Sequence, residues 1–296
     1  MKQSELIKKL ALGTVQLGLP YGVNNFSGKP DQHESFGILS TAWSKGIDLL
    51  DSAEAYGDSQ QVIGSFIESH PEANFSIVSK FSSAGPSISD GCARSLHQLR
   101  QSSIYAYLYH RFADYQGGEV HAELCKLKRD GYVKKIGISL YGEEELLAVL
   151  DDDDIELIQI PFNIFDASPT KQKLLLMAKQ RGKEIHVRSV FLQGLFFKQP
   201  ESLPGPLKGV APALRQLQNC LERHSIDVMT ACLNHALHAP FIDRVVIGVE
   251  RTEQLLINLS SIREELSESL TVDLARIEVA DRTLLNPANW NTPRTR

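Results

Sequence analysis

The chain has 296 residues, of which 42% are hydrophobic and 23% are charged, and its formal net charge is −5. These proportions are ordinary for a globular protein, and the length suits one α/β barrel of about 250 residues. The negative balance argues against nucleic acid or an anionic membrane surface as the main partner.

No segment of the sequence predicts export or membrane insertion. The start, MKQSELIKKL, is not followed by the apolar run of a signal peptide, and no stretch approaches the ~18 apolar residues of a membrane helix. Cys92, Cys125, Cys220 and Cys232 are widely spaced without a CxxC pair. This favours buried thiols in a reducing cytoplasm over disulfides or a zinc site. We expect a cytoplasmic protein without a metal site, with a monomer as the default.

Eight short apolar runs recur at a regular interval along the chain. Nearly continuous apolar runs are typical of parallel strands that helices cover on the outside. The predicted strands are 10–17, 47–53, 75–81, 104–110, 133–139, 157–162, 184–190 and 244–249.

Amphipathic stretches of helix length lie between these runs. In SQQVIGSFIES, the apolar face consists of Val62, Ile63, Phe66 and Ile67. Asp58 and Gln61 have the spacing of a capping pair at the start of that helix.

Eight alternations of strand and helix predict parallel pairing with right-handed crossovers, closed into a (β/α)8 TIM barrel that forms a single domain over residues 1–296. The runner-up is an open doubly wound sheet, which prefers a GxGxxG turn that LGTVQLGLPYG lacks.

Two regions interrupt the period. Residues 191–240 form a long insertion that begins rich in Pro and Gly, with helices expected near 211–223 and 226–238, and we expect it to act as a lid or cofactor loop. The tail 283–296 is polar. Its Trp290 is either a wall of the substrate pocket or a packing residue.

Barrel active sites lie at the C-terminal ends of the strands, so the polar residues there are candidates. Asp51 ends the second predicted strand, and Tyr56 lies in the loop just beyond it. Lys80 and His110 end the third and fourth. Because alternate side chains share a face, Ala106, Leu108 and His110 lie on one face of the fourth strand, and Tyr105, Tyr107 and Tyr109 on the other.

These four groups suit proton transfer. A tyrosine with a pKa of about 10 is a weak acid at neutral pH, and a nearby Lys80 ammonium is expected to lower that pKa. Asp51 would keep the lysine charged, and His110 would orient a carbonyl oxygen or assist the transfer. No side chain delivers hydride, so the chemistry requires a cofactor.

At this point the sequence resembles the aldo-keto reductase family. GIDLLDSAEAYGDSQQVIG resembles the family's strand ending in Asp-Thr-Ala, followed by Tyr-Gly and a helix. IVSKF carries the lysine, YLYHRF the histidine, and GYVKKIGIS resembles the segment Gly-Lys-Ile-Arg-x-Ile-Gly-Val-Ser. The similarity runs from about residue 10 to 265. It implies a tetrad of Asp51, Tyr56, Lys80 and His110, with Tyr56 as the general acid.

The resemblance also implies a nicotinamide site. Ser139 and Gln159 would bind the carboxamide, and Arg188 falls where some members stack a side chain on the nicotinamide ring. The loop with Gln193 and Gly194 would pass over the pyrophosphate. The adenosine end would lie at the start of the helix that follows the eighth strand, because free N–H groups at a helix start suit phosphate. The residues implied there are Gly248, Glu250, Arg251, Gln254 and Asn258.

Some positions depart from the family pattern. Ser52 replaces the commoner threonine, Leu140 stands where many members have an asparagine, and Ile257 stands where some have a glutamate that reads the adenine. The charge of Glu250 would oppose a 2′-phosphate, and Arg251 would offset it. The family's habit favours NADP(H), and NAD(H) remains the alternative.

These inferences predict NAD(P)H-dependent reduction of an aldehyde or ketone, a small-molecule carbonyl substrate. One alternative is a non-catalytic nicotinamide-binding sensor or regulatory protein, like the potassium-channel β subunits that share this fold. Another is a lyase with Lys80 as a Schiff-base nucleophile. Aromatic residues near the strand ends predict an apolar mouth: Phe81, Phe112, Phe162 and Phe165.

Overall fold

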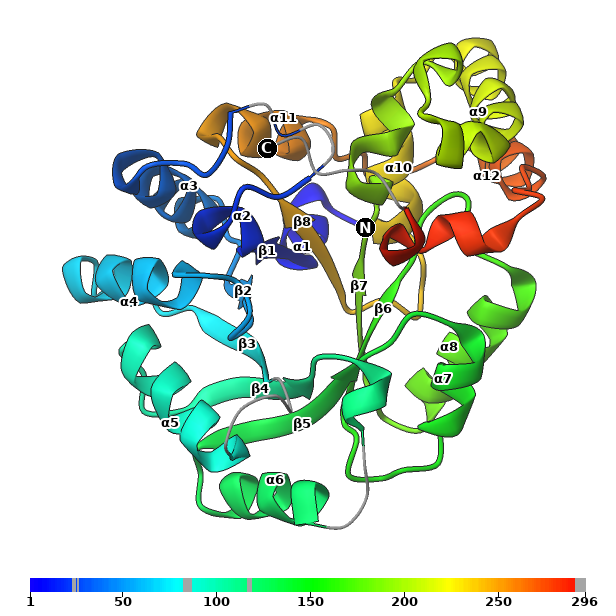
Figure 1. Cartoon of the computed structure of the whole chain (residues 1–296). Coiled ribbons are helices and arrows are strands. Elements are labelled where there is room, and N and C mark those ends of the chain that lie inside the picture. The colour runs from blue at the N-terminus through cyan, green and yellow to red at the C-terminus, as the bar shows by residue number, and fades with distance from the viewer. Residues whose placement is uncertain (23–24, 26, 82–86, 116–118, 291–296) are drawn as a thin grey trace.

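The computed structural model describes residues 1–22, 25, 27–81, 87–115 and 119–290. Eight parallel strands close into a barrel in chain order, and β8 pairs with β1 (Figure 1). The strands are β1 (Leu10–Gly13), β2 (Leu49–Asp51), β3 (Ser76–Phe81), β4 (Ile104–Tyr109), β5 (Val133–Ser139), β6 (Leu157–Pro161), β7 (Glu184–Arg188) and β8 (Arg244–Gly248). The predicted (β/α)8 barrel is confirmed, and closure excludes the open sheet.

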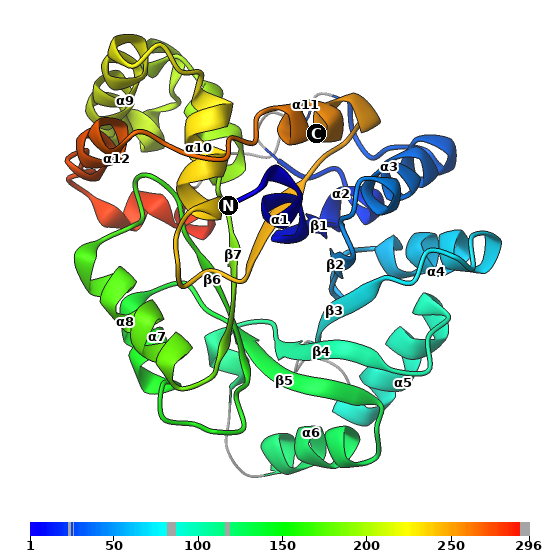
Figure 2. The same ribbon diagram turned by 180° about the vertical axis from the view of Figure 1, so that it is seen from behind.

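Helices surround the barrel and also cover one end of it. Figure 2 shows α1 in front of the strands, at the end from which β1 starts. The α-helices are α1 (Gln3–Lys8), α2 (Val15–Gly18), α3 (Gln32–Ser44), α4 (Ser59–Ser69), α5 (Ile88–Leu99), α6 (Glu119–Arg129), α7 (Glu143–Ala148), α8 (Pro169–Gln180), α9 (Ala211–Arg223), α10 (Val228–Leu237), α11 (Thr252–Ser260) and α12 (Glu268–Ala275). No helix among the described residues has the length and apolar character needed to cross a bilayer.

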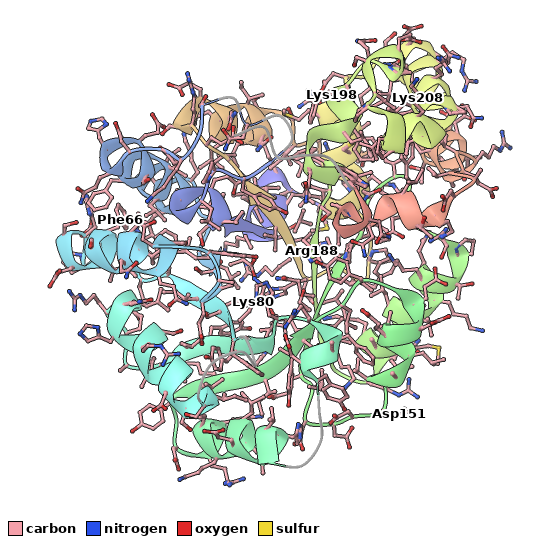
Figure 3. All side chains as sticks on the ribbon, viewed as in Figure 1. Phe66, Lys80, Asp151, Arg188, Lys198 and Lys208 are labelled. Atoms are coloured by element: carbon pink, nitrogen blue, oxygen red, sulfur yellow. The ribbon has the colours of Figure 1, made fainter. Side chains whose placement is uncertain are left out.

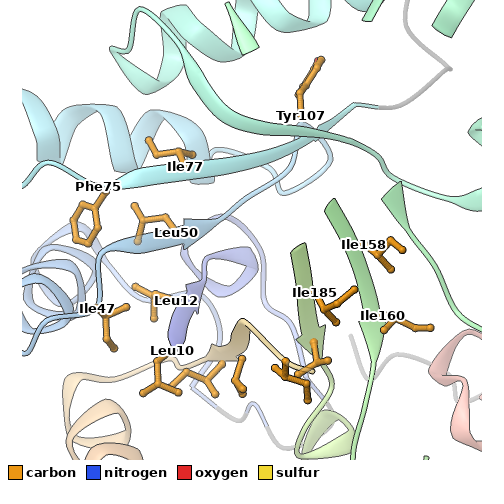
Figure 4. Packing of buried hydrophobic residues seen from close by; sticks show 14 of the residues in the cluster. Leu10, Leu12, Ile47, Leu50, Phe75, Ile77, Tyr107, Ile158, Ile160 and Ile185 are labelled. Carbon is orange, nitrogen blue, oxygen red and sulfur yellow. The ribbon is translucent and has the colours of Figure 1, made fainter. Parts of the chain in front are cut away.

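The side chains of the strands divide into an inner and an outer layer. The inner layer is small and holds Ala11, Leu49, Val78, Ala106, Leu108, Leu157 and Val246. The outer layer lies between strands and helices and is larger; Figure 4 shows part of it, including Leu12, Leu50, Ile77 and Ile158. Each fully buried side chain of this kind contributes roughly 1.5–3 kcal/mol, so the outer layer supplies most of the hydrophobic stabilisation.

The first predicted strand is too long. β1 ends at Gly13, and the residues from Val15 form the short helix α2 instead of continuing the strand. The turn brings Gly18 against the loop after β2, where a Cβ on Gly18 would lie 1.7 Å from the carbonyl oxygen of Tyr56. The apolar run therefore serves two elements, and its second half packs one side of the loop that carries Tyr56.

The face assignment of the fourth strand is confirmed for four of its residues and wrong for Tyr105. Ala106 and Leu108 belong to the inner layer, and Tyr107 and Tyr109 to the outer. Tyr105 packs against the inner layer, and its hydroxyl donates to Glu184 of β7 at 2.7 Å. The alternation breaks at the start of β4 because the tyrosine reaches this carboxylate inside the barrel.

The expected capping pair of α4 is not formed. Asp58 is the residue before the helix, but its side chain makes no capping hydrogen bond and instead forms an ion pair with Lys29. The expectation of buried thiols also needs one correction, because Cys92, Cys220 and Cys232 are buried while Cys125 is partly exposed.

The insertion after β7 begins with three 3-10 helices, η2 (Leu192–Phe197), η3 (Pro200–Ser202) and η4 (Gly205–Val210), followed by α9 and α10. It packs in a second hydrophobic cluster with α12 and the tail, and both views show α9 beside α12. Trp290 lies in this cluster, where its Nε1 donates to the carbonyl oxygen of Leu284 at 2.7 Å. Of the two roles considered for Trp290, the structure supports packing. Residues 291–296 of the tail lie outside the described residues.

Candidate active site

A cavity of about 590 Å³ opens at the C-terminal end of the barrel, and it is lined by residues at or just beyond the end of every strand. The residues at or just beyond the strand ends are Gly13, Asp51, Lys80, His110, Ser139, Gln159, Arg188 and Gly248. The register explains the convergence, because Gly13 pairs with Asp51 and Ser139 pairs with Gln159 across neighbouring strands. Tyr56, from the loop between β2 and α4, also lines the cavity.

The floor of the cavity is a buried ion pair. Lys80 is 1% exposed, and its Nζ donates to Asp51 Oδ2 at 2.7 Å and to the carbonyl oxygen of Ser52 at 2.9 Å. The third neighbour is the hydroxyl oxygen of Tyr56, at 3.5 Å from the same Nζ. The four residues predicted as a tetrad therefore meet, since the His110 and Tyr56 rings also lie edge to face with centroids 5.9 Å apart.

The charges in this group differ from the sequence-based expectation at Tyr56. Burial raises the pKa of the Tyr56 hydroxyl above its ordinary value, and the opposing effect of Lys80 offsets only part of the rise. Lys80 lowers this pKa, as expected, but burial outweighs that effect, so the net shift is upward. Tyr56 is a protonated phenol at neutral pH, ready to donate.

Lys80 and His110 are shifted in opposite directions. Burial alone would lower the pKa of Lys80, but Asp51 and Tyr56 raise it above its ordinary value. Burial and the Lys80 charge lower the pKa of His110 to about 4, so its imidazole is neutral at pH 7. With its pKa raised, Lys80 is charged at neutral pH and is a poor amine nucleophile, which argues against the Schiff-base alternative.

Ser139 and Gln159 are two polar residues of neighbouring strands that line the cavity beside the ion pair. Gln159 Nε2 donates to Asp51 Oδ1 at 2.7 Å, which fixes the amide orientation. Its Oε1 is buried and has no hydrogen-bond partner among the described residues. Gln159 and Ser139 pair in the register and both line the cavity, so this unpaired acceptor fits the N–H of a carboxamide such as that of nicotinamide. Leu140, which stands where many family members have an asparagine, is fully buried in the outer layer and offers no polar group to a carboxamide.

Arg188 ends β7 at the cavity mouth, and Figure 3 shows it near Lys80 at the centre of the barrel. Its Nη2 donates to the carbonyl oxygen of Leu140 at 3.1 Å. Its guanidinium carbon lies 4.4 Å from the centroid of the Tyr141 ring, a cation–π contact.

Gln193 and Gly194 line the cavity from η2. Both have positive φ, 53° and 88°, a conformation that is strained for a glutamine and easy for a glycine. This bend directs the Gln193 amide across the cavity, where Nε2 donates to the Tyr21 hydroxyl at 2.8 Å. The bridge joins the loop after α2 to the insertion after β7.

Of the five residues predicted to bind the adenosine end, four line the cavity and Arg251 does not. Gly248, Glu250, Gln254 and Asn258 line the cavity, and Asn258 Oδ1 is buried without a partner among the described residues. Arg251 is exposed and is not among the residues that line the cavity; its Nη2 donates to Ser27 Oγ at 3.0 Å.

The expectation of free N–H groups at the start of α11 is wrong for its first residue. Glu34 Oε1 accepts from the Thr252 backbone N–H at 2.6 Å and from the Thr252 hydroxyl at 2.8 Å. The N–H of Glu250 donates to Gln254 Oε1. These donors are already satisfied by the chain itself.

The predicted aromatic mouth is wrong in its members. Phe81, Phe112 and Phe162 belong to the outer layer, and Phe165 to the cluster under the insertion. The cavity is lined by other large side chains, which the sequence reasoning missed: Tyr21, Tyr141, Phe191, Phe197 and Met229. Part of this lining comes from the loop after α2, with Tyr21 and Asn25, and part from the insertion after β7.

Comparison with known proteins agrees with this geometry. The model of the Aldo/keto reductase family matches residues 9–278. The "NADH-specific methylglyoxal reductase" of Escherichia coli (strain K12) is 22% identical over 89% of this chain and 92% of that protein. "Aldo-keto reductase str7" of Strobilurus tenacellus is 26% identical, over 67% of this chain and 62% of its own length.

A third relative and a solved structure extend the comparison. The "D-threo-aldose 1-dehydrogenase" of Pseudomonas sp is 22% identical over 90% of this chain and 95% of that protein. The structure of aldo-keto reductase AKR11C1 from Bacillus halodurans, in its holo form, has a TM-score of 0.72 at 19% identity and covers 91% of each chain. The family match spans nearly the whole chain and includes the barrel and the residues around its cavity. The protein belongs to the aldo/keto reductase family of oxidoreductases.

Proposed function

We propose that this protein reduces an aldehyde or ketone to an alcohol, with Tyr56 as the proton donor. The observation that carries the proposal is the position of the Tyr56 hydroxyl, 3.5 Å from a buried ammonium that Asp51 keeps charged. Bound reduced nicotinamide would supply the hydride.

The residues of the tetrad have separate tasks in this proposal. Because burial raises the pKa of Tyr56, the hydroxyl holds its proton until negative charge develops on the substrate oxygen. The Lys80 ammonium then stabilises the tyrosinate that remains. Neutral His110 donates an N–H to the same substrate oxygen and so orients the carbonyl.

The residues proposed to bind the cofactor also have separate tasks, each at a different part of the cavity. Ser139 and Gln159 would hold the carboxamide, since Gln159 Oε1 is buried with no hydrogen-bond partner among the described residues. One face of the Arg188 guanidinium packs on Tyr141, which leaves the other for the nicotinamide ring. Gln193 and Gly194 would cover the pyrophosphate. Asn258, whose Oδ1 has no partner among the described residues, would accept a hydrogen bond at the adenosine end, where Gly248, Glu250 and Gln254 also line the cavity.

The charges around α11 support NAD(H) over the NADP(H) that the family's habit suggests. Two carboxylates, Glu34 and Glu250, lie at the start of this helix, and Glu34 occupies the first N–H. The nearest compensating cation in the sequence, Arg251, is directed to Ser27. A 2′-phosphate would meet net negative charge there.

The insertion would act as a lid over the bound substrate. It supplies Phe191, Phe197 and Met229 to the cavity, while Tyr21 faces them from the opposite loop. This mixed aromatic and aliphatic lining suits a small carbonyl compound such as an aldehyde, a quinone or a deoxysugar ketone.

Titration with NADH and NADPH, followed by a panel of carbonyl compounds, tests the proposal. We expect a shift in the fluorescence of the reduced nicotinamide on binding, and carbonyl-dependent oxidation of the bound cofactor. Binding without turnover on any carbonyl would favour the sensor alternative, and failure to bind either nucleotide would refute both.

A further inference from the structure

Among the described residues that line the cavity, Lys80 and Arg188 are the two cations, and only Lys80 has a carboxylate partner. Lys80 is neutralised by Asp51 at 2.7 Å. No acidic side chain among the described residues lies within ion-pair distance of Arg188. A half-buried guanidinium that lines a cavity in this state favours the arrival of an anion.

The hydrogen-bonding capacity of Arg188 is also largely unused. A guanidinium has five N–H donors. Two bonds are present, from Nη2 to the carbonyl oxygen of Leu140 at 3.1 Å and from Nη1 to Ser189 Oγ at 3.4 Å. Tyr141 packs on one face of the group and holds it in place, so the remaining donors are preorganised rather than mobile.

The guanidinium is close enough to the proton donor to act on the same small molecule. The register pairs Gln159 with His186 and Pro161 with Arg188, so Arg188 is two residues nearer the mouth than the position facing Gln159. Arg188 and Tyr56 line the same cavity, and the Arg188 charge is one of the causes that lower the pKa of Tyr56, His110 and Tyr21. None of these three groups is negatively charged at neutral pH, so none of them neutralises Arg188.

The rest of the cavity near the tetrad carries no net charge that would repel an anion. Asp51 and Lys80 cancel each other. The other carboxylate in the lining, Glu250, is bound to Gln254 of α11, on the side proposed for the adenosine. The reacting end is therefore positive overall.

We propose that the substrate of this site is an anionic carbonyl compound, whose carboxylate pairs with Arg188 while its carbonyl oxygen meets Tyr56. The inference rests on the proposed reductase function and adds the substrate class. Arg188 is then a specificity-determining residue, because a planar fork of donors matches a carboxylate better than a neutral group.

Matched pairs of substrates test this inference: 4-carboxybenzaldehyde against benzaldehyde, and succinic semialdehyde against butanal. We expect the wild-type protein to prefer the anion of each pair. At saturating reduced cofactor, Arg188→Gln should lower the anion-to-neutral ratio of kcat/KM in each pair about thirtyfold, as for loss of a charged hydrogen bond, because weaker packing on the nicotinamide ring would affect both members of a pair alike. Arg188→Lys should restore part of the preference, and Lys208→Gln, an equal charge change at an exposed position outside the cavity, should have no effect.

Binding of benzoate to the protein saturated with reduced cofactor gives a readout that needs no turnover. The wild type and Lys208→Gln should bind benzoate, and Arg188→Gln should bind it about thirtyfold more weakly. Equal losses for anionic and neutral carbonyls in Arg188→Gln, or benzoate binding that is unchanged by this substitution, would overturn the inference. Benzoate binding that depends on Arg188 without turnover of any carbonyl would refute the reductase function alone.

Discussion

The Nζ atom of Lys80 lies 3.5 Å from the hydroxyl oxygen of Tyr56, at the outer limit of a hydrogen bond. While the phenol is neutral, the short hydrogen bonds of the ammonium go to Asp51 and to the carbonyl oxygen of Ser52. It is positioned to shorten this contact when the phenol loses its proton, which makes the stabilisation specific to the reacting state.

Tyr56→Phe removes the proton donor and keeps the ring. We expect turnover to fall by about 100- to 10,000-fold, the usual contribution of a positioned general acid, with cofactor affinity little changed. Steady-state rates and fluorescence titration of the reduced cofactor measure the two effects separately. Unchanged turnover would rule out Tyr56 as the donor.

Lys80→Met leaves the carboxylate of Asp51 buried without its cation. Asp51 is 4% exposed, and after the substitution its carboxylate keeps, among the described residues, only the bond from Gln159. We expect a loss of about 3–5 kcal/mol in the free energy of unfolding, measured by urea denaturation. The double variant Lys80→Met, Asp51→Asn removes the unpaired charge and should recover much of the stability without recovering activity. Equal stability of the single and double variants would contradict the ion-pair argument.

The pH dependence of stability reports on His110. Its pKa is about 4 in the folded protein and about 6.5 in an unfolded chain, so the unfolded state binds more protons between these values. Stability should therefore fall as the pH drops from 6.5 towards 4 and change no further from this group below that. The His110 contribution between pH 7 and pH 4.5 is roughly 2 kcal/mol.

Urea denaturation of His110→Gln at the two pH values checks this contribution. The variant should lose less stability on acidification than the wild type. His235→Gln should behave similarly, because burial also lowers the pKa of His235 to about 4. His97→Gln, at an exposed position on α5, serves as the control. An unaltered pH dependence in His110→Gln would mean that this imidazole is not held neutral by the fold.

Glu250 should control the choice between the two nicotinamide dinucleotides. Its carboxylate opposes a 2′-phosphate, so the wild type should bind NADH more tightly than NADPH. Glu250→Gln should raise the affinity for NADPH by about tenfold at low salt, equivalent to about 1.4 kcal/mol, and leave that for NADH nearly unchanged. Glu253→Gln, exposed in the first turn of α11 and outside the cavity lining, is the matched control. Equal effects of the two substitutions would show that the local charge around Glu250 is not the determinant.

The sequence predicts the barrel because each strand is a short, nearly continuous apolar run and the runs are evenly spaced. It also predicts which side chains meet in the tetrad, since the ends of parallel strands converge in any closed barrel. The prediction that Phe81 lies at the cavity mouth is wrong, although the alternation of side chains along a strand would have excluded it. Lys80 points into the cavity, so the next residue, Phe81, points to the outer layer.

What the sequence did not predict depends on partners far along the chain. Glu34 occupies the N–H of Thr252, which is 218 residues away. Tyr105 points inward because its hydroxyl bonds Glu184 of β7, and the residues around Tyr105 do not reveal this distant partner. Burial raises the pKa of Tyr56 and the charge of Lys80 lowers it, and only the extent of burial in the folded protein decides the sign of the net shift.

The bridge between Tyr21 and Gln193 should govern the release of the cofactor. The two side chains reach across the cavity from loops 172 residues apart in the sequence, and the bond between them is 2.8 Å long. Tyr21→Phe removes the acceptor and keeps the ring, so the aromatic wall remains. A net hydrogen bond of this kind is worth about 1 kcal/mol, which predicts a dissociation rate of the reduced cofactor roughly fivefold faster.

Stopped-flow displacement of the reduced cofactor measures that rate directly. Gln193→Ala should accelerate dissociation as much as Tyr21→Phe, and the double variant should add nothing further, because both single changes break the same bond. Tyr132→Phe, at an exposed position before β5 and outside the cavity, should leave the rate unchanged. Additive effects of the two single changes would mean that Tyr21 and Gln193 contact the cofactor independently rather than closing over it together.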